Sequence, residues 1–253
     1  MLGAVAAPVL AYGWFEAGWL RMRVLEVPIT GLPEELEGLR IAHLSDFHLG
    51  PRSRGAVAVR QAADWVRQRR PDLTVVTGDL LSHPRGRAQL DEALRGLGAY
   101  AVLGNHDVAV TRDPFSRAAA LDGLQATLLD DESRLLDLRG VPVQLAGAGP
   151  RPSSSLPEPD PAAAFRILLS HYPRLRASGF HLVLAGHMHA GQIVLPYPGG
   201  KIRFAHLNAS LSEGLYRRGG VTLHVSPGLG TTFVPFRLFA RPEVTELVLR
   251  RLT

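Results

Sequence analysis

Short apolar runs alternate with longer amphipathic stretches through the first half of the sequence. The runs Leu39–Ser45, Leu73–Thr77 and Tyr100–Leu103 have the length and aliphatic content of buried strands. Between them, Arg54–Arg69 and Ala88–Leu97 have the length and the spacing of apolar residues that are typical of helices. Strands that alternate with helices predict a sheet covered by helices, and they exclude a fold built from strands alone.

The second half of the chain has a different pattern, in which strand-like runs dominate. We predict strands at Val141–Ala146, Phe165–Leu169, Leu182–Leu184, Gln192–Leu195, Lys201–Phe204, Val221–Val225 and Val244–Leu249. One more helix is predicted at Phe115–Gln125. The whole pattern indicates a mixed α/β (α+β) fold in which two packed β-sheets are flanked by helices.

Composition limits the kinds of site that the chain can build. Its 253 residues include no cysteine, which excludes disulfides and thiolate metal sites and leaves histidine, carboxylate, asparagine and backbone ligands. The net charge is +5, and Lys201 is the only lysine among 28 basic residues. Such an excess of positive charge favours binding to nucleic acid, to an anionic membrane or to a phosphorylated substrate. Nucleic acid is the least favoured, because the arginines are scattered without a stacking motif or a basic helix.

The first 20 residues are apolar except for Glu16, and Arg21 and Arg23 follow them. A bilayer span needs about 20 such residues, and a tryptophan such as Trp19 beside arginine is typical of a membrane boundary. We therefore interpret residues 1–27 as a segment that resembles a membrane anchor, which spans the bilayer or lies in its interface. The arginines on its carboxyl side favour a cytoplasmic location for the rest of the chain.

Two alternatives remain open for this segment. It could be a helix packed on the domain, or a cleaved signal peptide, which fits less well because Met1–Ala4 carries no basic residue. Residues 28–38 contain the turn residues Pro28, Gly31 and Pro33 and are predicted to form a linker. Residues 39–253 would then form one folded domain.

Side chains that bind metals follow five of the predicted strands directly. They are Asp46 and His48 after the first strand, Asp79 after the second, Asn105, His106 and Asp107 after the third, His171 after residue 169, and His187 and His189 after residue 184. In open α/β sheets, ligands bind at the carboxyl ends of the strands, so five separate segments are expected to converge. A single cluster of this kind is most often structural, and the ordered set of five indicates a functional site.

These five clusters resemble the signature of the calcineurin-like metallophosphoesterases, and the resemblance extends from Leu39 to the end of the chain. It implies a calcineurin-like sandwich of two sheets and two divalent metal ions. By resemblance, Asp46, His48, Asp79 and His189 hold one ion, and Asp79, Asn105, His171 and His187 hold the other, with Asp79 as the bridge. His106 would act on the substrate phosphate or the leaving group, oriented by Asp107.

The residue types suit that chemistry independently. Hydrolysis of a phosphate ester requires neutralised phosphate oxygens and a strong nucleophile, which two divalent cations roughly 3.5–4 Å apart supply when bound. Mixed nitrogen and oxygen ligands favour manganese, iron or zinc over calcium or magnesium, and we expect manganese. His106 is expected to donate a proton or a hydrogen bond as charge develops on the leaving oxygen, and its alternative role is structural.

Several motifs toward the carboxyl terminus resemble one bacterial, membrane-associated branch of the family. They are Gly186–Ile193, Gly214–Tyr216, Ser226–Gly230 and Arg241–Glu243. That branch includes phosphoesterases similar to UDP-2,3-diacylglucosamine pyrophosphatase, which act on a nucleotide-linked lipid. Met188 and Ala190 occupy positions at which this branch usually has threonine and glycine. Neither is an expected metal ligand, so the two departures concern the shape of the substrate pocket.

The segment Thr231–Phe239 is apolar, aromatic and interrupted by proline, which predicts either core packing or an exposed lip that meets acyl chains or a bilayer. We therefore expect a hydrolase of phosphoester or pyrophosphate bonds that acts at a membrane surface on a nucleotide-linked or other phospholipid-type substrate. The alternatives are a phosphodiesterase or phosphatase with a soluble substrate, a nuclease, and a non-catalytic scaffold, the least favoured because every ligand position is retained. The oligomeric state stays open.

Overall fold

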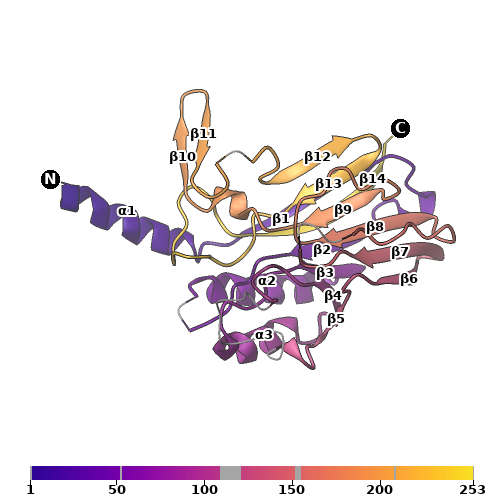
Figure 1. Cartoon of the computed structure of the whole chain (residues 1–253), viewed down its shortest axis with the longest axis horizontal. Coiled ribbons are helices and arrows are strands. Elements are labelled where there is room, and N and C mark those ends of the chain that lie inside the picture. Colours follow the sequence, from indigo (N-terminus) through magenta and orange to yellow (C-terminus); the bar gives the residue numbers. More distant parts are fainter. Residues whose placement is uncertain (1, 52, 109–120, 152–154, 208, 253) are drawn as a thin grey trace.

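The computed structural model describes residues 2–51, 53–108, 121–151, 155–207 and 209–252 (Figure 1). They form two six-stranded sheets, one hairpin and three α-helices, which are α1 (Leu2–Glu16), α2 (Gly55–Arg69) and α3 (Arg87–Leu94). The mixed α/β architecture with two sheets and helices is confirmed. The helix predicted at Phe115–Gln125 lies mainly outside the described residues.

The first sheet has the strand order β1-β14-β2-β3-β4-β5. Its strands are β1 (Arg21–Ile29), β14 (Glu243–Arg251), β2 (Arg40–Leu44), β3 (Leu73–Thr77), β4 (Ala99–Val102) and β5 (Ala126–Leu128). Strands β2 to β5 are parallel, while β14 runs antiparallel to β2 and parallel to β1. The carboxyl ends of β2, β3 and β4 therefore lie at one edge of this sheet.

The second sheet has the order β12-β13-β9-β8-β7-β6. Its strands are β12 (Gly214–Arg218), β13 (Val221–Val225), β9 (Leu182–Ala185), β8 (Phe165–Ser170), β7 (Val141–Gly147) and β6 (Ser133–Leu138). The four central strands are parallel, and the two edge strands are antiparallel to their neighbours. Strands β10 (Val194–Tyr197) and β11 (Gly200–Arg203) form a separate hairpin that projects from the molecule (Figure 1).

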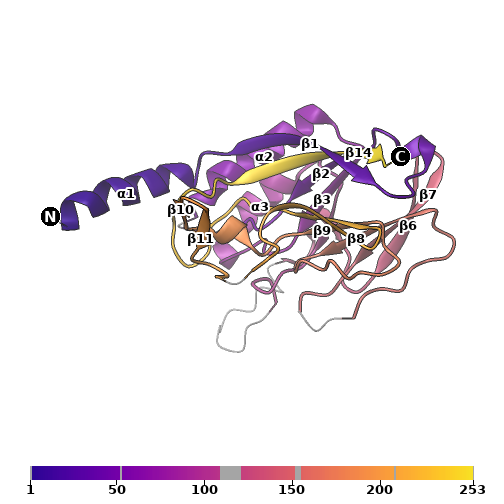
Figure 2. The ribbon, with the colours of Figure 1, turned by 90° about the horizontal axis from the view of Figure 1, so that it is seen from above.

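The main core lies between the two sheets, where β3 and β4 face β8. Ile41 and Val75 of the first sheet pack with Ile167 and Leu184 of the second, and all four are fully buried. Helix α2 packs on the outer face of the first sheet, because apolar residues such as Val59 recur at helical spacing on one side (Figure 2). Loop segments, not helices, cover the outer face of the second sheet among the described residues.

The chain before residue 39 differs from the prediction. Residues Arg21–Ile29 form strand β1, which pairs with β14 over nine positions, and Leu36 is fully buried in the core. The predicted boundaries at residues 27 and 38 therefore do not coincide with a break in the structure. Pairing with β14 accounts for the difference, because it provides backbone hydrogen bonds to a segment with exposed arginines.

Helix α1 projects from one end of the molecule (Figures 1 and 2). Its last residue, Glu16, is fully buried, and its carboxylate accepts hydrogen bonds from the backbone of Phe239 at 2.9 Å and of Ala240 at 2.6 Å. The charge that interrupts the apolar segment thus fixes the end of the helix to the domain. Within the described residues, no helix has the length and apolarity needed to cross a bilayer.

Candidate metal centre

The predicted site residues meet where the loops after β2, β3, β4, β8 and β9 converge. Five of them adopt the left-handed backbone conformation, with φ between 45° and 72°: Asp46, His48, Asp79, His187 and His189. This conformation costs a residue other than glycine about 1–2 kcal/mol, so the surrounding structure must enforce it. Strained residues cluster at functional sites, where they aim side chains that a regular strand would point elsewhere.

Two glycines allow the carboxylates to reach this point. A Cβ atom at Gly104 would collide with Oδ1 of Asp79, and one at Gly186 would collide with Oγ of Ser45 and Oδ2 of Asp46. Neither glycine has a positive φ. They are needed for close approach and not for a left-handed turn, which is the role that Gly78 has at φ 84°.

The first group of possible ligands is Asp46, His48 and His189, whose ligand atoms lie within 4.8 Å of one another. Nε2 of His48 lies 3.1 Å from Nε2 of His189, and Nε2 of His189 lies 3.5 Å from Oδ1 of Asp46. All three side chains are buried. Two imidazole nitrogens and a carboxylate oxygen that converge at such distances match the ligand chemistry of a divalent transition metal.

The second group is Asp79, His171 and His187, and its ligand atoms also lie within 4.8 Å of one another. Nε2 of His171 lies 3.3 Å from Oδ2 of Asp79 and 3.1 Å from Nδ1 of His187. Oδ1 of Asn105 lies 3.0 Å from the same Nε2 of His171. The structure therefore brings Asn105 to the group in which the resemblance places it.

The tautomer of His171 follows from its second ring nitrogen. Nδ1 lies 2.9 Å from the carbonyl oxygen of Thr77. A carbonyl accepts only, so Nδ1 carries a hydrogen, and Nε2 is the nitrogen that faces Asp79 and His187 and would bind a metal ion. A histidine that is fixed through its other nitrogen in this way is typical of metal sites.

Burial and neighbouring charges set the protonation states of the site. Burial lowers the pKa of His48 and of His187 to about 3, so both rings stay neutral, which is the form that binds metal. Burial also opposes charge on His171, but Asp79 and Asp46 outweigh it and raise the pKa of His171 to about 9. The carboxylates therefore stabilise positive charge where the two ligand groups meet, and metal ions would supply such charge. The residues thus fit two divalent cations.

Asp107 is buried and joins two of the loops that carry ligands. Its carboxylate accepts hydrogen bonds from the backbone of Leu80 at 2.8 Å, Leu81 at 3.1 Å and Gly104 at 2.9 Å. Burial, with the nearby charge of Asp79, raises the pKa of Asp107 to about 7. These contacts hold the loop after β3 against the loop after β4.

His106 lies at the mouth of the site and is partly buried. Its ring centroid is 5.0 Å from that of His48 and 6.1 Å from that of Phe233, whose side chain is 95% exposed. The backbone amide of His106 donates to Oδ1 of Asp79 at 2.8 Å. His106 therefore lies next to the first ligand group, on the side that opens to solvent.

Arg237 is a site component that the sequence did not indicate. It is fully buried, and its guanidinium donates to backbone oxygens of Pro227, Gly228, Gly230 and Ala240 at 2.7–3.1 Å. It also lies 3.2 Å from Nδ1 of His189, whose pKa is lowered well below its usual value by burial and further by the charges of His48 and Arg237. A single arginine within an apolar run gives no sequence signal for this role.

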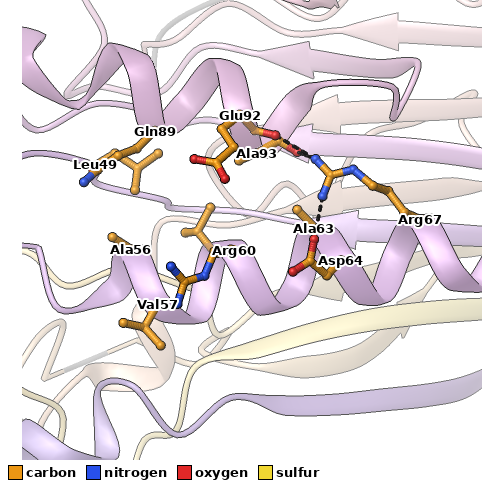
Figure 3. A pocket seen from close by; sticks show the side chains of 11 residues that line it. Leu49, Ala56, Val57, Arg60, Ala63, Asp64, Arg67, Gln89, Glu92 and Ala93 are labelled. Carbon is orange, nitrogen blue, oxygen red and sulfur yellow. Dashed lines mark hydrogen bonds and ion pairs between the residues drawn. The ribbon is translucent and has the colours of Figure 1, made fainter.

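A hollow of about 640 Å³ opens beside His48, and Arg85, Phe233 and Pro235 are among its other lining residues. A smaller hollow of about 250 Å³ lies between α2 and α3, away from this site (Figure 3). Arg67 of α2 donates to Asp64 of the same helix and, across the hollow, to the backbone oxygen of Glu92 in α3. None of the described residues that line this hollow is a predicted metal ligand, so the hollow is a feature of the packing of α2 against α3.

Comparison with known proteins decides the family. Residues 39–191 match the family model of the calcineurin-like phosphoesterases. The chain belongs to this family. Residues 39–191 are thus a calcineurin-like phosphoesterase domain, and the two groups of histidine and aspartate are residues that could hold metal ions.

This phosphoesterase is similar to several curated proteins. It is 31% identical to a Danio rerio "transmembrane protein with metallophosphoesterase domain" over 90% of the chain, and it spans 56% of that protein. It is 29% identical to the uncharacterized metallophosphoesterase YkuE of Bacillus subtilis, covering 99% of the chain and 95% of YkuE. It is 28% identical to the UDP-2,3-diacylglucosamine pyrophosphatase LpxG of Chlamydia trachomatis, covering 95% and 93%.

Proposed function

We propose that this phosphoesterase hydrolyses a phosphoester or pyrophosphate bond of a lipid-linked substrate, nucleotide-linked or phospholipid-type, at a membrane surface. In this proposal Asp46, His48, Asp79 and His189 hold one metal ion, and Asp79, Asn105, His171 and His187 hold the other. When bound, two such ions neutralise phosphate oxygens and lower the pKa of water. We favour manganese over iron and zinc, all of which suit these ligands.

The chain's own side chains provide the rest of the chemistry in this proposal. Oδ2 of Asp79 lies 3.3 Å from Nε2 of His48 and from Nε2 of His171, so one carboxylate serves both groups. His106, at the mouth, is positioned to donate a hydrogen bond to the leaving oxygen as charge develops there. Asp107 fixes the loop that carries His106.

The observation that carries the lipid assignment is the apolar surface beside the site. Its exposed residues are Val9, Leu10, Tyr12, Trp14, Phe15 and Trp19 of the amino-terminal segment, Leu195, Tyr197, Ile202 and Phe204 of the hairpin region, and Phe233 and Phe239. Helix α1 and the hairpin lie at the same end of the molecule (Figures 1 and 2). Soluble monomers rarely expose so many large apolar side chains together, which favours contact with lipid.

Cations lie within this surface. The guanidinium of Arg241 lies 3.8 Å from the ring centroid of Trp19, and that of Arg54 lies 5.4 Å from the ring of Trp14. Tryptophan beside arginine suits the headgroup layer of a bilayer, and the positive charge suits anionic lipids. The same arrangement supports attachment through α1, with the catalytic domain on the cytoplasmic side.

The names of relatives support the proposal. LpxG is named for a pyrophosphatase reaction on a diacylated, nucleotide-linked sugar, and two vertebrate relatives are named as transmembrane proteins. The chain spans about half of those two vertebrate proteins, so the comparison extends to one part of them.

The proposal is tested with purified chain that is stripped of metal and reloaded with manganese. We expect release of UMP from UDP-2,3-diacylglucosamine in mixed micelles, with a strong preference over bis(p-nitrophenyl) phosphate. Hydrolysis of the aryl ester alone would overturn the assignment to this lipid and favour a soluble substrate. No hydrolysis of either substrate would overturn the proposed function.

A further inference from the structure

Two hollows beside the metal centre share part of their lining, and the two together are called the groove. The first, of about 640 Å³, has the ligand His48 and Arg85 in its lining, and Phe233 and Val234 provide an apolar wall. The second, of about 420 Å³, is lined by six residues: Trp14, Pro51, Ser53, Arg54, Val57 and Pro235. Pro51, Ser53 and Pro235 line both hollows, so the two are neighbours between the ligand loop and α1.

The groove is polar at one end and apolar at the other. Its inner end holds His48, with the cation Arg85, which suits a phosphate. Its outer end is lined mainly by the carbon atoms of Trp14, Val57 and Pro235, together with Arg54, whose guanidinium lies over the Trp14 ring. A molecule that matches both ends carries a phosphate at the metals and a hydrocarbon chain that leads away from them.

We propose that this groove binds one alkyl chain of the substrate, with α1 forming the outer wall through Trp14. The proposal rests on the proposed function, because it takes a phosphate at the metal centre as its starting point. It adds that α1 contacts the substrate itself and is not only an attachment to the membrane. Each methylene buried in such a groove changes affinity by about fourfold at full burial, and by about twofold where half of it stays exposed.

The test is a series of alkylphosphonates with methyl, hexyl, octyl and decyl chains, titrated calorimetrically into the full chain loaded with manganese. We expect the dissociation constant to fall by about twofold to fourfold with each methylene. Trp14→Ser and Val57→Gln should flatten this dependence and leave the affinity for methylphosphonate unchanged. Leu135→Ser, at an exposed apolar residue of β6, is the matched control and should keep the wild-type dependence.

Affinity that is independent of chain length, or variants with the wild-type dependence, would overturn the groove assignment. Calorimetry reads binding without turnover, so this outcome differs from a failure of the proposed function, in which neither the lipid nor the aryl ester is hydrolysed. If Trp14→Ser does not fold, Val57→Gln tests the same wall from α2.

A second inference rests on a chain of hydrogen bonds in the core between the sheets. Nδ1 of His224 lies 2.8 Å from Nδ1 of His43, and Nε2 of His43 lies 2.9 Å from Oγ1 of Thr77. The hydroxyl of Thr77 donates to Oγ of Ser45 at 2.8 Å, and the hydroxyl of Ser45 donates to Oδ2 of Asp46 at 2.5 Å. All five side chains are buried, and the chain ends on a predicted metal ligand.

The direction of donation fixes both tautomers. Because the Thr77 hydrogen points to Ser45, Thr77 accepts from His43, which therefore carries its hydrogen on Nε2. Nδ1 of neutral His43 then accepts from Nδ1 of His224, which leaves a lone pair on Nε2 of His224. That Nε2 is buried and has no hydrogen-bond partner among the described residues, so no acceptor there calls for a hydrogen on it. Every donor in the chain points toward Asp46.

We infer that His43 and His224 are positioning residues for the first metal ion. They hold the Thr77 and Ser45 hydroxyls in the orientation that fixes Oδ2 of Asp46 and leaves Oδ1 directed at His189, 3.5 Å away. Without His43, the Thr77 hydroxyl is free to turn, so the Ser45 hydroxyl is held less firmly on Oδ2 of Asp46, whose other donor is the backbone amide of His187 at 3.1 Å. Loss of an outer contact of this kind weakens a metal site by about 10- to 100-fold.

The test is titration of manganese into the metal-stripped full chain, with each site resolved by calorimetry. His43→Leu should weaken one of two sites by about tenfold and spare the other, and His43→Gln, which keeps a donor, should recover part of the loss. The control is His181→Leu, which removes a partly buried histidine that stacks on Phe165 and lies outside this chain of hydrogen bonds. A lower melting temperature with unchanged manganese affinity at both sites would overturn the inference. If His43→Leu does not fold, Thr77→Val breaks the chain at the next link.

Discussion

Oδ2 of Asp79 lies 3.3 Å from Nε2 of His48, although the two residues belong to different groups of possible ligands. The same oxygen lies 3.3 Å from Nε2 of His171, within its own group. One carboxylate thus faces a histidine of each group, and its other oxygen is fixed by the backbone of His106 at 2.8 Å. This geometry supports the proposal that Asp79 binds both metal ions.

Asp79→Asn is therefore expected to remove both metals and the activity together. Asparagine lacks the charge that offsets two cations, and its amide nitrogen cannot act as a ligand. Asp46→Asn should remove only one ion, because Asp46 faces only the first group. Metal content per chain, measured by mass spectrometry after dialysis, separates these outcomes. Equal losses in the two variants would contradict the shared position of Asp79.

His106→Ala is expected to retain both metals and to lower turnover by about 10²- to 10⁴-fold, because a donor to the leaving group is lost. Phe233 and His48 flank the ring of His106, so the space that the substitution leaves lies at the mouth of the site and does not reach the core. Steady-state kinetics on an aryl phosphodiester, together with metal content, check this expectation. Full turnover would assign His106 a structural role, and loss of metal would make it a ligand.

Phe15→Ser and Phe239→Ser are expected to weaken binding to anionic vesicles by about tenfold each, since each removes a large apolar side chain from the lipid interface. The two residues are 54% and 53% exposed, so the free energy of unfolding should change by less than about 0.5 kcal/mol. Sedimentation with phosphatidylserine vesicles measures the binding. Unchanged sedimentation of the double variant would contradict the membrane surface.

Glu16→Ala is expected to destabilise the protein by about 3 kcal/mol, because it leaves two backbone amides near Phe239 without their charged acceptor. Urea denaturation followed by circular dichroism measures the change. The control is Glu132→Ala, in which an exposed carboxylate that pairs with Arg134 is removed at a cost of about 0–1 kcal/mol. Equal effects of the two substitutions would show that α1 is not fixed to the domain through Glu16.

The central strands could be predicted from the sequence, and the edge strands could not. Apolar runs in the sequence predicted β2, β3 and β4 of the first sheet and all four parallel strands of the second. Strands that are buried on both faces consist of continuous apolar residues, so they are easy to predict. The four strands that were missed, β1, β5, β6 and β12, are the two edges of each sheet. Edge strands are partly exposed and carry charged residues, so the apolar pattern that marks a strand is weak there.

The convergence of the candidate site residues could be predicted because each of them follows a strand that is easy to recognise. Residues that support the site were missed for the opposite reason. Arg237 and Glu16 are single charges within apolar segments, and only the fold shows that each meets backbone groups far away in sequence. His43 and His224 lie inside strands, where nothing in the sequence connects them.

The number of manganese ions per chain, measured together with hydrolysis, tests the central claim most directly. The account predicts that stripped chain is inactive toward bis(p-nitrophenyl) phosphate, and that activity rises with added manganese until two ions are bound per chain. Activity in the stripped chain, or saturation at one ion per chain, would contradict a centre built from both groups around Asp79.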